Sequence, residues 1–298
     1  MSGLRVSRIF IQPVKSLRGH EVAAAEVDEL GLVGDRRFVI ADAEGRFLTQ
    51  RTLPRMATIA ARVADGTLRL TAPDMPELTV PLRGEPDLPK LTGPLRGEPG
   101  AATLRRVTIW KSEGLLAEDC GSDAARWLGA ALGRPCSLLR AGPDFVRPIP
   151  LHRVPEPLKA AAPRVACNDA FPFMVVGEAS LADLNDRLAA EGLPAVPMER
   201  FRPSFAVAGG EPFAEDTWAS FQVGGLTLYA AGRCARCIVT CLDPWSGDRG
   251  VEPLRLLSAY RRDSQDPTQV MFGQNAIHAY AGPGRRIAVG DPVDPQRA

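Results

Sequence analysis

The sequence predicts a mainly β protein with some α-helix, that is, an α+β fold. Glycine (28) and proline (27) are both abundant, which favours many short strands joined by turns over a bundle of long helices. Short apolar runs separated by turn residues recur along the chain, and only a few segments have the periodicity of an amphipathic helix. With 298 residues, the chain has room for one large domain or two ordinary ones.

The overall charge and the cysteine content argue against several classes of protein. The net charge is +1, with 45% hydrophobic and 24% charged residues, which is a globular composition and makes nucleic acid a poor partner. Six cysteines are too few for a disulfide scaffold. There is neither a run of eighteen apolar residues nor the apolar stretch of a signal peptide, so we expect no membrane span and a cytoplasmic location.

The first part of the chain alternates between strand-like runs and turns. Proline 13 ends the first run, and Gly31 and Gly34 lie in the turn between the second and third. We interpret residues 1–120 as an N-terminal antiparallel barrel or sandwich domain. Its predicted strands are residues 4–11, 21–28, 36–42, 46–51 and 67–71.

A helix and a proline-rich segment follow this part. Residues 122–132 have an apolar stripe, with Ser122 as a cap and Gly133 as a stop, which predicts a helix. Residues 142–163 are rich in proline and mostly aperiodic, which is typical of a crossing between domains or of a loop over a site. We therefore expect a connection over residues 121–165.

Residues 166–298 are predicted to form a second domain. Its first helix, at 178–188, has Ser180 and Asp183 at the spacing of a capping box, and a later helix at 252–261 has Pro253 at its first position. Strands are expected at residues 171–176, 200–209, 221–231 and 236–241, with a final strand and turn at 287–293.

Three of the six cysteines lie in residues 230–244, at Cys234, Cys237 and Cys241. Arg233 and Arg236 flank the first two, and nearby cations favour the thiolate, the form of cysteine that binds metals and attacks electrophiles. This Cys-x-x-Cys-x-x-x-Cys spacing has several possible meanings, and buried thiols without a function are one of them.

Common metal and redox sites fit this spacing poorly. Zinc needs four ligands, and the three histidines, His20, His152 and His278, are dispersed. An iron–sulfur cluster needs four cysteines in characteristic runs. A thioredoxin-like dithiol lies where a strand meets a helix, whereas here the second cysteine opens an apolar run, IVT, that we interpret as a strand.

A single thiolate could instead bind a metal that an organic cofactor holds by its other bonds. That arrangement escapes the four-ligand requirement, but it needs an anion site for the phosphate of the cofactor. The sequence offers four candidate groups of cationic or hydroxyl residues, and spacing alone does not show whether they converge. They are Lys15 with Ser16, Arg36 with Arg37, Arg51, and Arg202.

Several motifs, in the same order along nearly the whole chain, resemble the MOSC family. The similarity is strongest to the amidoxime-reducing components and to bacterial YcbX-like proteins. The motifs are QPVKSLRG (12–19), GDRRFVI (34–40), FPFMVVGEASLADLN (171–185), FRPSFAV (201–207) and RCARCIVTCLDPWSG (233–247), followed by EPLRLLSAYR and FGQNA.

The resemblance implies an N-terminal MOSC β-barrel domain, a C-terminal barrel-like MOSC domain, and a molybdenum–molybdopterin cofactor between them. In the family the second cysteine of Arg-Cys-x-x-Cys is the single protein ligand of the metal, as in sulfite-oxidase-type sites, and here it is Cys237. The family's phosphate and pterin contacts match Lys15, Ser16, Arg36 and Arg202. The segment from Asn168 to Phe171 would lie against the cofactor, and Arg51 is a further candidate contact.

The family's chemistry is the reductive removal of oxygen from N-hydroxylated compounds such as amidoximes and hydroxylamine-type bases. Because the chain ends without a ferredoxin-like cysteine run, we expect an external electron donor, such as a ferredoxin or a cytochrome b5-like protein with its reductase. Asp169 matches an acidic residue of the family and could orient a substrate amine or relay a proton. Arg147, in the proline-rich segment, is a candidate for the mouth of the site.

The chain departs from the eukaryotic relatives at three positions. Ala170 and Phe171 stand where those relatives have small hydroxyl residues, and Ser204 stands where they have asparagine. These departures bear on the substrate range. The alternatives are a molybdenum cofactor carrier or sulfur-transfer protein, because cofactor sulfurases carry a similar domain, and a binding protein without molybdenum.

Overall fold

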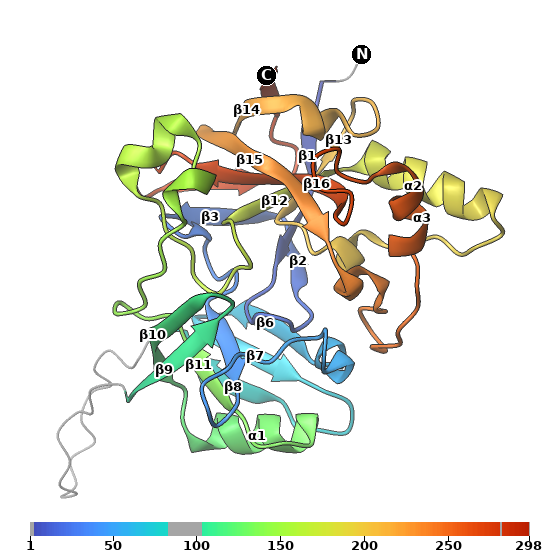
Figure 1. The fold of residues 1–298 in the computed structure, drawn as a ribbon. Helices are drawn as coiled ribbons and strands as arrows, with labels where there is room; N and C mark the ends of the chain where they lie inside the picture. The colour runs from blue at the N-terminus through green and yellow to red at the C-terminus, as the bar shows by residue number, and fades with distance from the viewer. Residues whose placement is uncertain (1–2, 83–102, 281, 298) are drawn as a thin grey trace, which may run out of the picture.

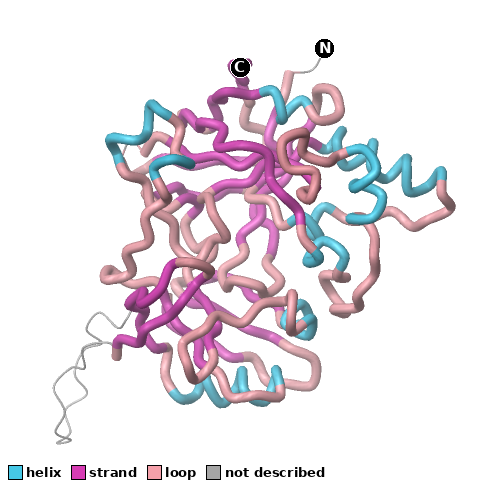
Figure 2. Tube along the Cα trace, in the orientation of Figure 1, coloured by secondary structure: helices cyan, strands magenta, loops and turns pink. Residues whose placement is uncertain are grey.

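The computed structural model describes residues 3–82, 103–280 and 282–297. In these residues two β-rich units lie one above the other, with the strands in four sheets (Figure 1). In the described part of the chain, three α-helices and six short 3₁₀ helices lie around the sheets (Figure 2). The mainly β, α+β fold class predicted from the sequence is confirmed.

The upper unit in Figure 1 is built on an eight-stranded sheet. Strand β12 pairs in parallel with β13, and the other pairs of this sheet are antiparallel. The strands lie in the order β18 (Asp294–Arg297), β14 (Trp218–Val223), β15 (Leu226–Arg236), β16 (Val270–His278), β12 (Phe173–Gly177), β13 (Phe205–Ala208), β1 (Arg5–Ile11) and β2 (His20–Val22). A three-stranded sheet completes the unit, in the order β17 (Arg285–Ala288), β3 (Ala24–Asp28) and β4 (Gly31–Leu32).

The lower unit has two smaller sheets, with α1 (Ser122–Leu132) along its outer side (Figure 1). Leu128 of this helix is fully buried in one core cluster with Phe38 and Leu68. One sheet has the order β5 (Phe38–Ala41), β11 (Ser137–Arg140), β10 (Ser112–Asp119) and β9 (Leu104–Ile109). The other has the order β6 (Ala60–Ala64), β7 (Thr67–Thr71) and β8 (Leu78–Pro81).

The sheets do not follow the boundaries 1–120, 121–165 and 166–298 drawn from the sequence. Strand β1, which has a register shift between Val6 and Arg8, pairs with β13 of the upper unit and buries Val6 and Ile9 beside Phe205. Helix α1 and β11 belong to the lower unit instead of a connection. The physical reason is burial: much of the apolar cover of β1 comes from strands far along the chain, such as β12 and β13.

The remaining helices lie mostly around the upper unit, with α2 (Glu178–Ala190) and α3 (Leu254–Tyr260) on one side of its sheet (Figure 1). Pro253 is the N-cap of α3 and not its first residue. The 3₁₀ helices are η1 (Pro54–Thr58), η2 (Leu151–Arg153), η3 (Glu156–Ala161), η4 (Met198–Phe201), η5 (Ala214–Thr217) and η6 (Ile238–Cys241). None of the helices in the described ranges is long and apolar enough to cross a membrane.

Two predicted strands are wrong. Residues 46–51 form only isolated bridges. Residues 238–241 turn into η6 instead of continuing β15, because Thr240 donates from both its backbone N–H and its hydroxyl to the Cys237 carbonyl, at 3.0 and 2.9 Å. An apolar run of four residues does not distinguish a strand from a helical turn.

The predicted capping box of α2 is also wrong. The N-cap is Gly177, and no side chain caps the helix. Ser180 instead donates its hydroxyl to the buried Glu215 carboxylate at 2.8 Å, and Gly177 N–H donates to the same group at 3.0 Å. The Glu215 carboxylate, from a distant part of the chain, therefore accepts one of the backbone N–H groups that the start of α2 leaves without a partner in the helix.

Replacing Glu215 by glutamine is expected to stabilise the protein more at pH 7 than near pH 4. Burial raises the pKa of Glu215 above its ordinary value, so with rising pH the unfolded chain loses this proton first, and the wild type loses stability from about pH 4.3 upward. Glutamine has no proton to lose. Urea unfolding of both proteins at the two pH values measures the difference, and a gap that stays constant or shrinks toward pH 7 would contradict this expectation.

Candidate functional site

A cleft of about 690 Å³ is lined by residues of both units. The site residues that the family resemblance implied all line it, although they come from positions up to 222 apart in the chain (237 − 15). Their convergence is a finding of the tertiary structure. They are Lys15, Ser16, Arg36, Arg51, Asn168, Asp169, Arg202 and Cys237. Arg37, a further candidate for the anion site, is not among the lining residues, and its Nη2 donates to Asp28 Oδ1 at 2.7 Å.

Three of these residues have left-handed backbone conformations. Ser16, Arg36 and Arg202 have φ of 66°, 50° and 54°, which are unfavourable for residues with a Cβ and persist only where surrounding contacts enforce them. The contacts are present: Arg36 N–H donates to Gln12 O at 2.8 Å, and Arg36 Nη2 donates to Arg202 O at 2.9 Å. Strain of this kind concentrates at functional sites, and the sequence does not reveal it.

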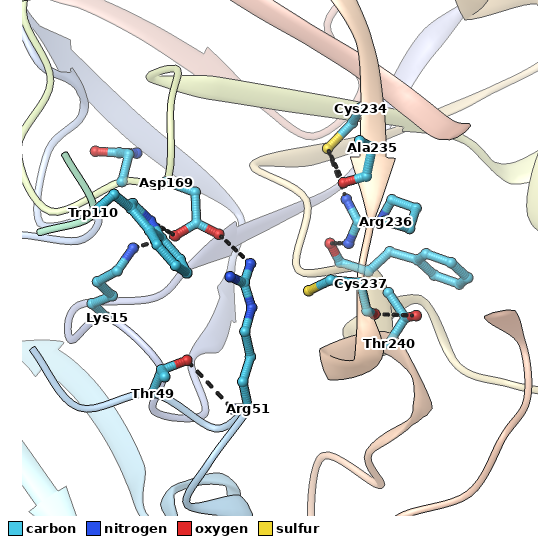
Figure 3. A network of polar contacts seen from close by, with 12 residues as sticks. Lys15, Thr49, Arg51, Trp110, Asp169, Cys234, Ala235, Arg236, Cys237 and Thr240 are labelled. Carbon is cyan, nitrogen blue, oxygen red and sulfur yellow. Dashed lines mark hydrogen bonds and ion pairs between the residues drawn. The ribbon is translucent and has the colours of Figure 1, made fainter. Parts of the chain in front are cut away.

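Lys15 and Asp169 form the centre of one wall of the cleft (Figure 3). The Lys15 ammonium, only 5% exposed, donates to Asp169 Oδ1. Trp110 Nε1–H donates to the same oxygen at 3.1 Å, and Arg51 Nη2 lies 3.8 Å from the other. The Arg51 guanidinium also lies over the Trp110 ring, 4.2 Å from its centroid.

The charges of this wall fix the state of the carboxylate. Partial desolvation works against ionisation of Asp169, but the Lys15 charge and hydrogen bond outweigh it and hold the pKa of Asp169 well below its usual range. Burial lowers the pKa of Lys15, and Asp169 opposes that shift. Asp169 is therefore ionised at neutral pH and can accept hydrogen bonds but not donate a proton.

Trp110 is a site residue that sequence reasoning missed. It lies in the turn between β9 and β10, has φ of 54° and is 39% exposed. A tryptophan beside Lys111 in a hairpin turn was the available signal, but a turn prediction says nothing about what the turn faces. Here it places the lower unit in direct contact with Asp169 of the upper one.

Cys237 lies on the opposite wall, where β15 ends and η6 begins (Figure 3). Its side chain is half-buried and points toward the wall that carries Arg51 and Asp169. Register shifts on β15 around Arg233 redirect this end of the strand, as β-bulges commonly do beside functional sites. An extended backbone at Cys237 is followed at once by the helical turn.

The other two cysteines of the motif have different environments. Cys234 also lines the cleft and accepts a hydrogen bond from Arg236 Nη1 at 3.0 Å. Cys241 is fully buried, as expected for a core thiol, and its burial raises its pKa. All three are free thiols.

The described ranges contain no group of three or more histidine, cysteine, aspartate or glutamate residues placed to hold a metal. Cys237 precedes a helical turn and not the strand expected from the sequence, so its local setting is closer to that of a dithiol site than we predicted. However, β15 pairs antiparallel with both neighbours, so this turn is not part of the βαβ unit in which thioredoxin-like dithiols occur.

The cleft suits an anionic organic group that brings its own hydrogen-bond donors. Asn168 is 3% exposed, and its Oδ1 lacks a hydrogen-bond partner within the described part of the chain. Burial lowers the pKa of Arg202 to about 10, and the neighbouring Arg36 adds to the shift. An anion bound between Arg202 and Arg36 would offset both the desolvation of Arg202 and the repulsion between the two guanidinium groups.

Ser204 and Phe171 line the cleft as well. Ser204 Oγ accepts a hydrogen bond from the backbone N–H of Met174 at 3.2 Å. The hydroxyl at this position therefore satisfies a backbone donor. Phe171 is buried beneath the Arg153 guanidinium, 4.6 Å from its ring centroid. All three positions at which the chain departs from its eukaryotic relatives, Ala170, Phe171 and Ser204, therefore line the cleft.

Models of two domains match this chain: the MOSC N-terminal beta barrel domain over residues 3–135 and the MOSC domain over residues 162–294. The chain belongs to the MOSC family. The family resemblance predicted from the sequence is thus confirmed.

Curated relatives agree over nearly the whole chain. Mitochondrial amidoxime-reducing component 1 of Homo sapiens is 32% identical, covering 97% of this chain and 82% of the relative. The protein of the same name from Mus musculus is 35% identical, covering 97% and 81%. Molybdenum cofactor sulfurase of Danio rerio is 29% identical over 94% of this chain, which corresponds to only 32% of that longer protein.

Proposed function

We propose that this protein is a molybdenum-cofactor-dependent reductase that removes oxygen from N-hydroxylated substrates, such as amidoximes and hydroxylamine-type bases. The observation that carries the proposal is a half-buried thiol, Cys237, which faces a cleft lined with cations and a fixed carboxylate. Membership of the MOSC family and relatives named for amidoxime reduction support it.

Each cleft residue has a role in this proposal. Cys237 is the single protein ligand of the metal, and thiolate is a suitable soft donor. Lys15, Ser16, Arg36 and Arg202 hold the phosphate, with Arg51 at the rim, and the free Asn168 Oδ1 accepts a donor of the pterin. The bound group supplies the two-electron chemistry, while the protein supplies orientation and electrostatics.

Asp169 orients the substrate. It is ionised and its side chain is 64% exposed, so it can accept a hydrogen bond from a protonated substrate nitrogen. A proton relay through Asp169, which the sequence left open, is disfavoured because its pKa lies far below neutrality. Burial lowers the pKa of Lys15, and the Asp169 charge opposes that shift.

The electrons come from a separate donor protein in this proposal, such as a ferredoxin or a cytochrome b5-like protein with its reductase. We place the protein in the cytoplasm, with no nucleic-acid partner. The second candidate is a cofactor carrier or sulfur-transfer protein, favoured by the similarity to a molybdenum cofactor sulfurase and by the second cleft thiol, Cys234.

One experiment separates these functions. The protein is purified from a host that makes molybdenum cofactor, its metal and pterin contents are measured, and benzamidoxime reduction is followed with a chemical reductant. Stoichiometric metal with turnover supports the reductase. Metal without turnover indicates the carrier, and the absence of both refutes a molybdenum function.

A further inference from the structure

Arg147 lies beneath the segment that carries two of the cleft residues. We call residues 166–169 the site loop. Arg147, a candidate for the mouth of the site in the sequence, is among the residues that line the cleft and is only 5% exposed. Its Nη1 donates to the carbonyls of Ala166 and Asn168, at 3.1 and 2.5 Å, and its Nη2 donates to the Asp169 carbonyl at 3.2 Å.

The same residue connects three parts of the fold. Nε donates to Ser112 Oγ at 3.1 Å, at the start of β10 in the lower unit. The Arg147 carbonyl accepts from Val165 N–H at 3.0 Å, immediately before the site loop. The crossing segment, the lower unit and the site loop are therefore all bonded to one side chain and its backbone.

A guanidinium suits this task better than any other side chain. Buried carbonyls of an irregular loop must find donors, because no strand or helix supplies them. Arginine offers five N–H donors spread over three nitrogens of a rigid planar group, whereas the three donors of lysine are all on one nitrogen. Within the described ranges, Arg147 has no carboxylate oxygen within 4.0 Å of its guanidinium, so these carbonyls are its main partners.

The Arg147 charge also acts on the cleft. Burial lowers the pKa of Arg147, and its charge adds to the burial that lowers the pKa of Lys15. The site loop presents Asp169 to Lys15 and Trp110. Arg147 therefore contributes to both the position and the electrostatics of the wall opposite Cys237.

We propose that Arg147 is a positioning residue for the reaction in the cleft. It holds the site loop so that Asn168 and Asp169 face the cleft, and it acts through these two residues. The identity of the reaction rests on the proposed function, but the control of the loop by Arg147 does not.

The first test needs no cofactor. Arg147→Lys keeps the charge and loses the planar group, and Arg147→Met loses both. Hydrogen exchange of the site-loop amides is compared with that of β14 in the purified protein. We expect about tenfold or faster exchange in the loop for Arg147→Lys, since at least one or two carbonyl bonds are lost, and unchanged exchange in β14.

Arg164 provides a matched control. Arg164 forms an isolated β-bridge with Pro148, the residue after Arg147. Its side chain, however, is 40% exposed, and its Nη2 lies 3.7 Å from Glu29 Oε1. Arg164→Lys and Arg164→Met should leave the site loop unchanged. Unaltered loop exchange in Arg147→Lys, or equal exchange changes for the two arginines, would overturn the proposal, even if Arg147→Met fails to fold.

The second test is a double-mutant cycle on the reductase. If Arg147 acts through Asp169, then Arg147→Lys lowers kcat/KM about tenfold or more in the wild type but changes it little in an Asp169→Asn background. Additive losses would refute the coupling. If the protein proves to have no reductase activity, the exchange experiment still decides whether Arg147 controls the loop, so the two failures are distinguishable.

Discussion

Cys237→Ala is expected to abolish reductase turnover and to lower the molybdenum content at least tenfold, while the protein stays folded. The Cys237 side chain is half-buried at the cleft, and η6 is held by its backbone carbonyl, not by its sulfur. Loss of the thiolate should therefore affect the metal far more than the fold. Metal analysis, benzamidoxime turnover and thermal unfolding measure the three effects.

Cys234→Ser is the matched control for this change. It alters a second thiol of the same cleft, three residues away, and keeps a group that can accept from Arg236. Metal content within about twofold of wild type is expected. Full metal and turnover in Cys237→Ala, or a larger loss in Cys234→Ser than in Cys237→Ala, would show that the ligand assignment is wrong.

Lys15→Met should weaken retention of the cofactor by about 10- to 100-fold. A charge-assisted hydrogen bond to a phosphate contributes about 1.5–3 kcal/mol, and methionine keeps the apolar stem of a side chain that is only 5% exposed. Asp169 retains the Trp110 N–H and the nearby Arg51, so we expect folding to be preserved. Equilibrium dialysis against released cofactor and the pterin content after gel filtration measure this loss.

Lys111→Met is the control for Lys15→Met, because Lys111 lines the same cleft but is exposed. An exposed charge is screened by solvent and contributes little, so retention should change by no more than about twofold. Equal losses in the two variants would mean that general positive charge, and not the buried ammonium, retains the cofactor.

Local elements were predicted well where the signal was local. Helix α1 occupies residues 122–132 as predicted, and its stop, Gly133, has φ of 70°. The predicted cap is wrong, because Gly121 is the N-cap and Ser122 is the first helical residue. Strand β7 matches the alternating run 67–71. In both cases side-chain periodicity and end signals are carried by neighbouring residues, so they can be read without knowing the rest of the fold.

Elements that depend on distant partners were not predicted. Glu215 serves α2 from a separate segment, and β1 lies in the upper unit because its apolar face packs there. The bonds of Arg147 to the site loop could not be predicted for the same reason, since the three carbonyls that it binds follow it by 19 to 22 residues.

The sequence by itself determined the fold class, the family and the types of residue available for chemistry: one cysteine motif and a set of dispersed cations. Only the tertiary structure decided that Lys15 meets Asp169, 154 residues away, and that Cys237 faces them across a cleft. The reason is that ion pairing and burial depend on distances in space, which are fixed by how the sheets pack and not by spacing along the chain.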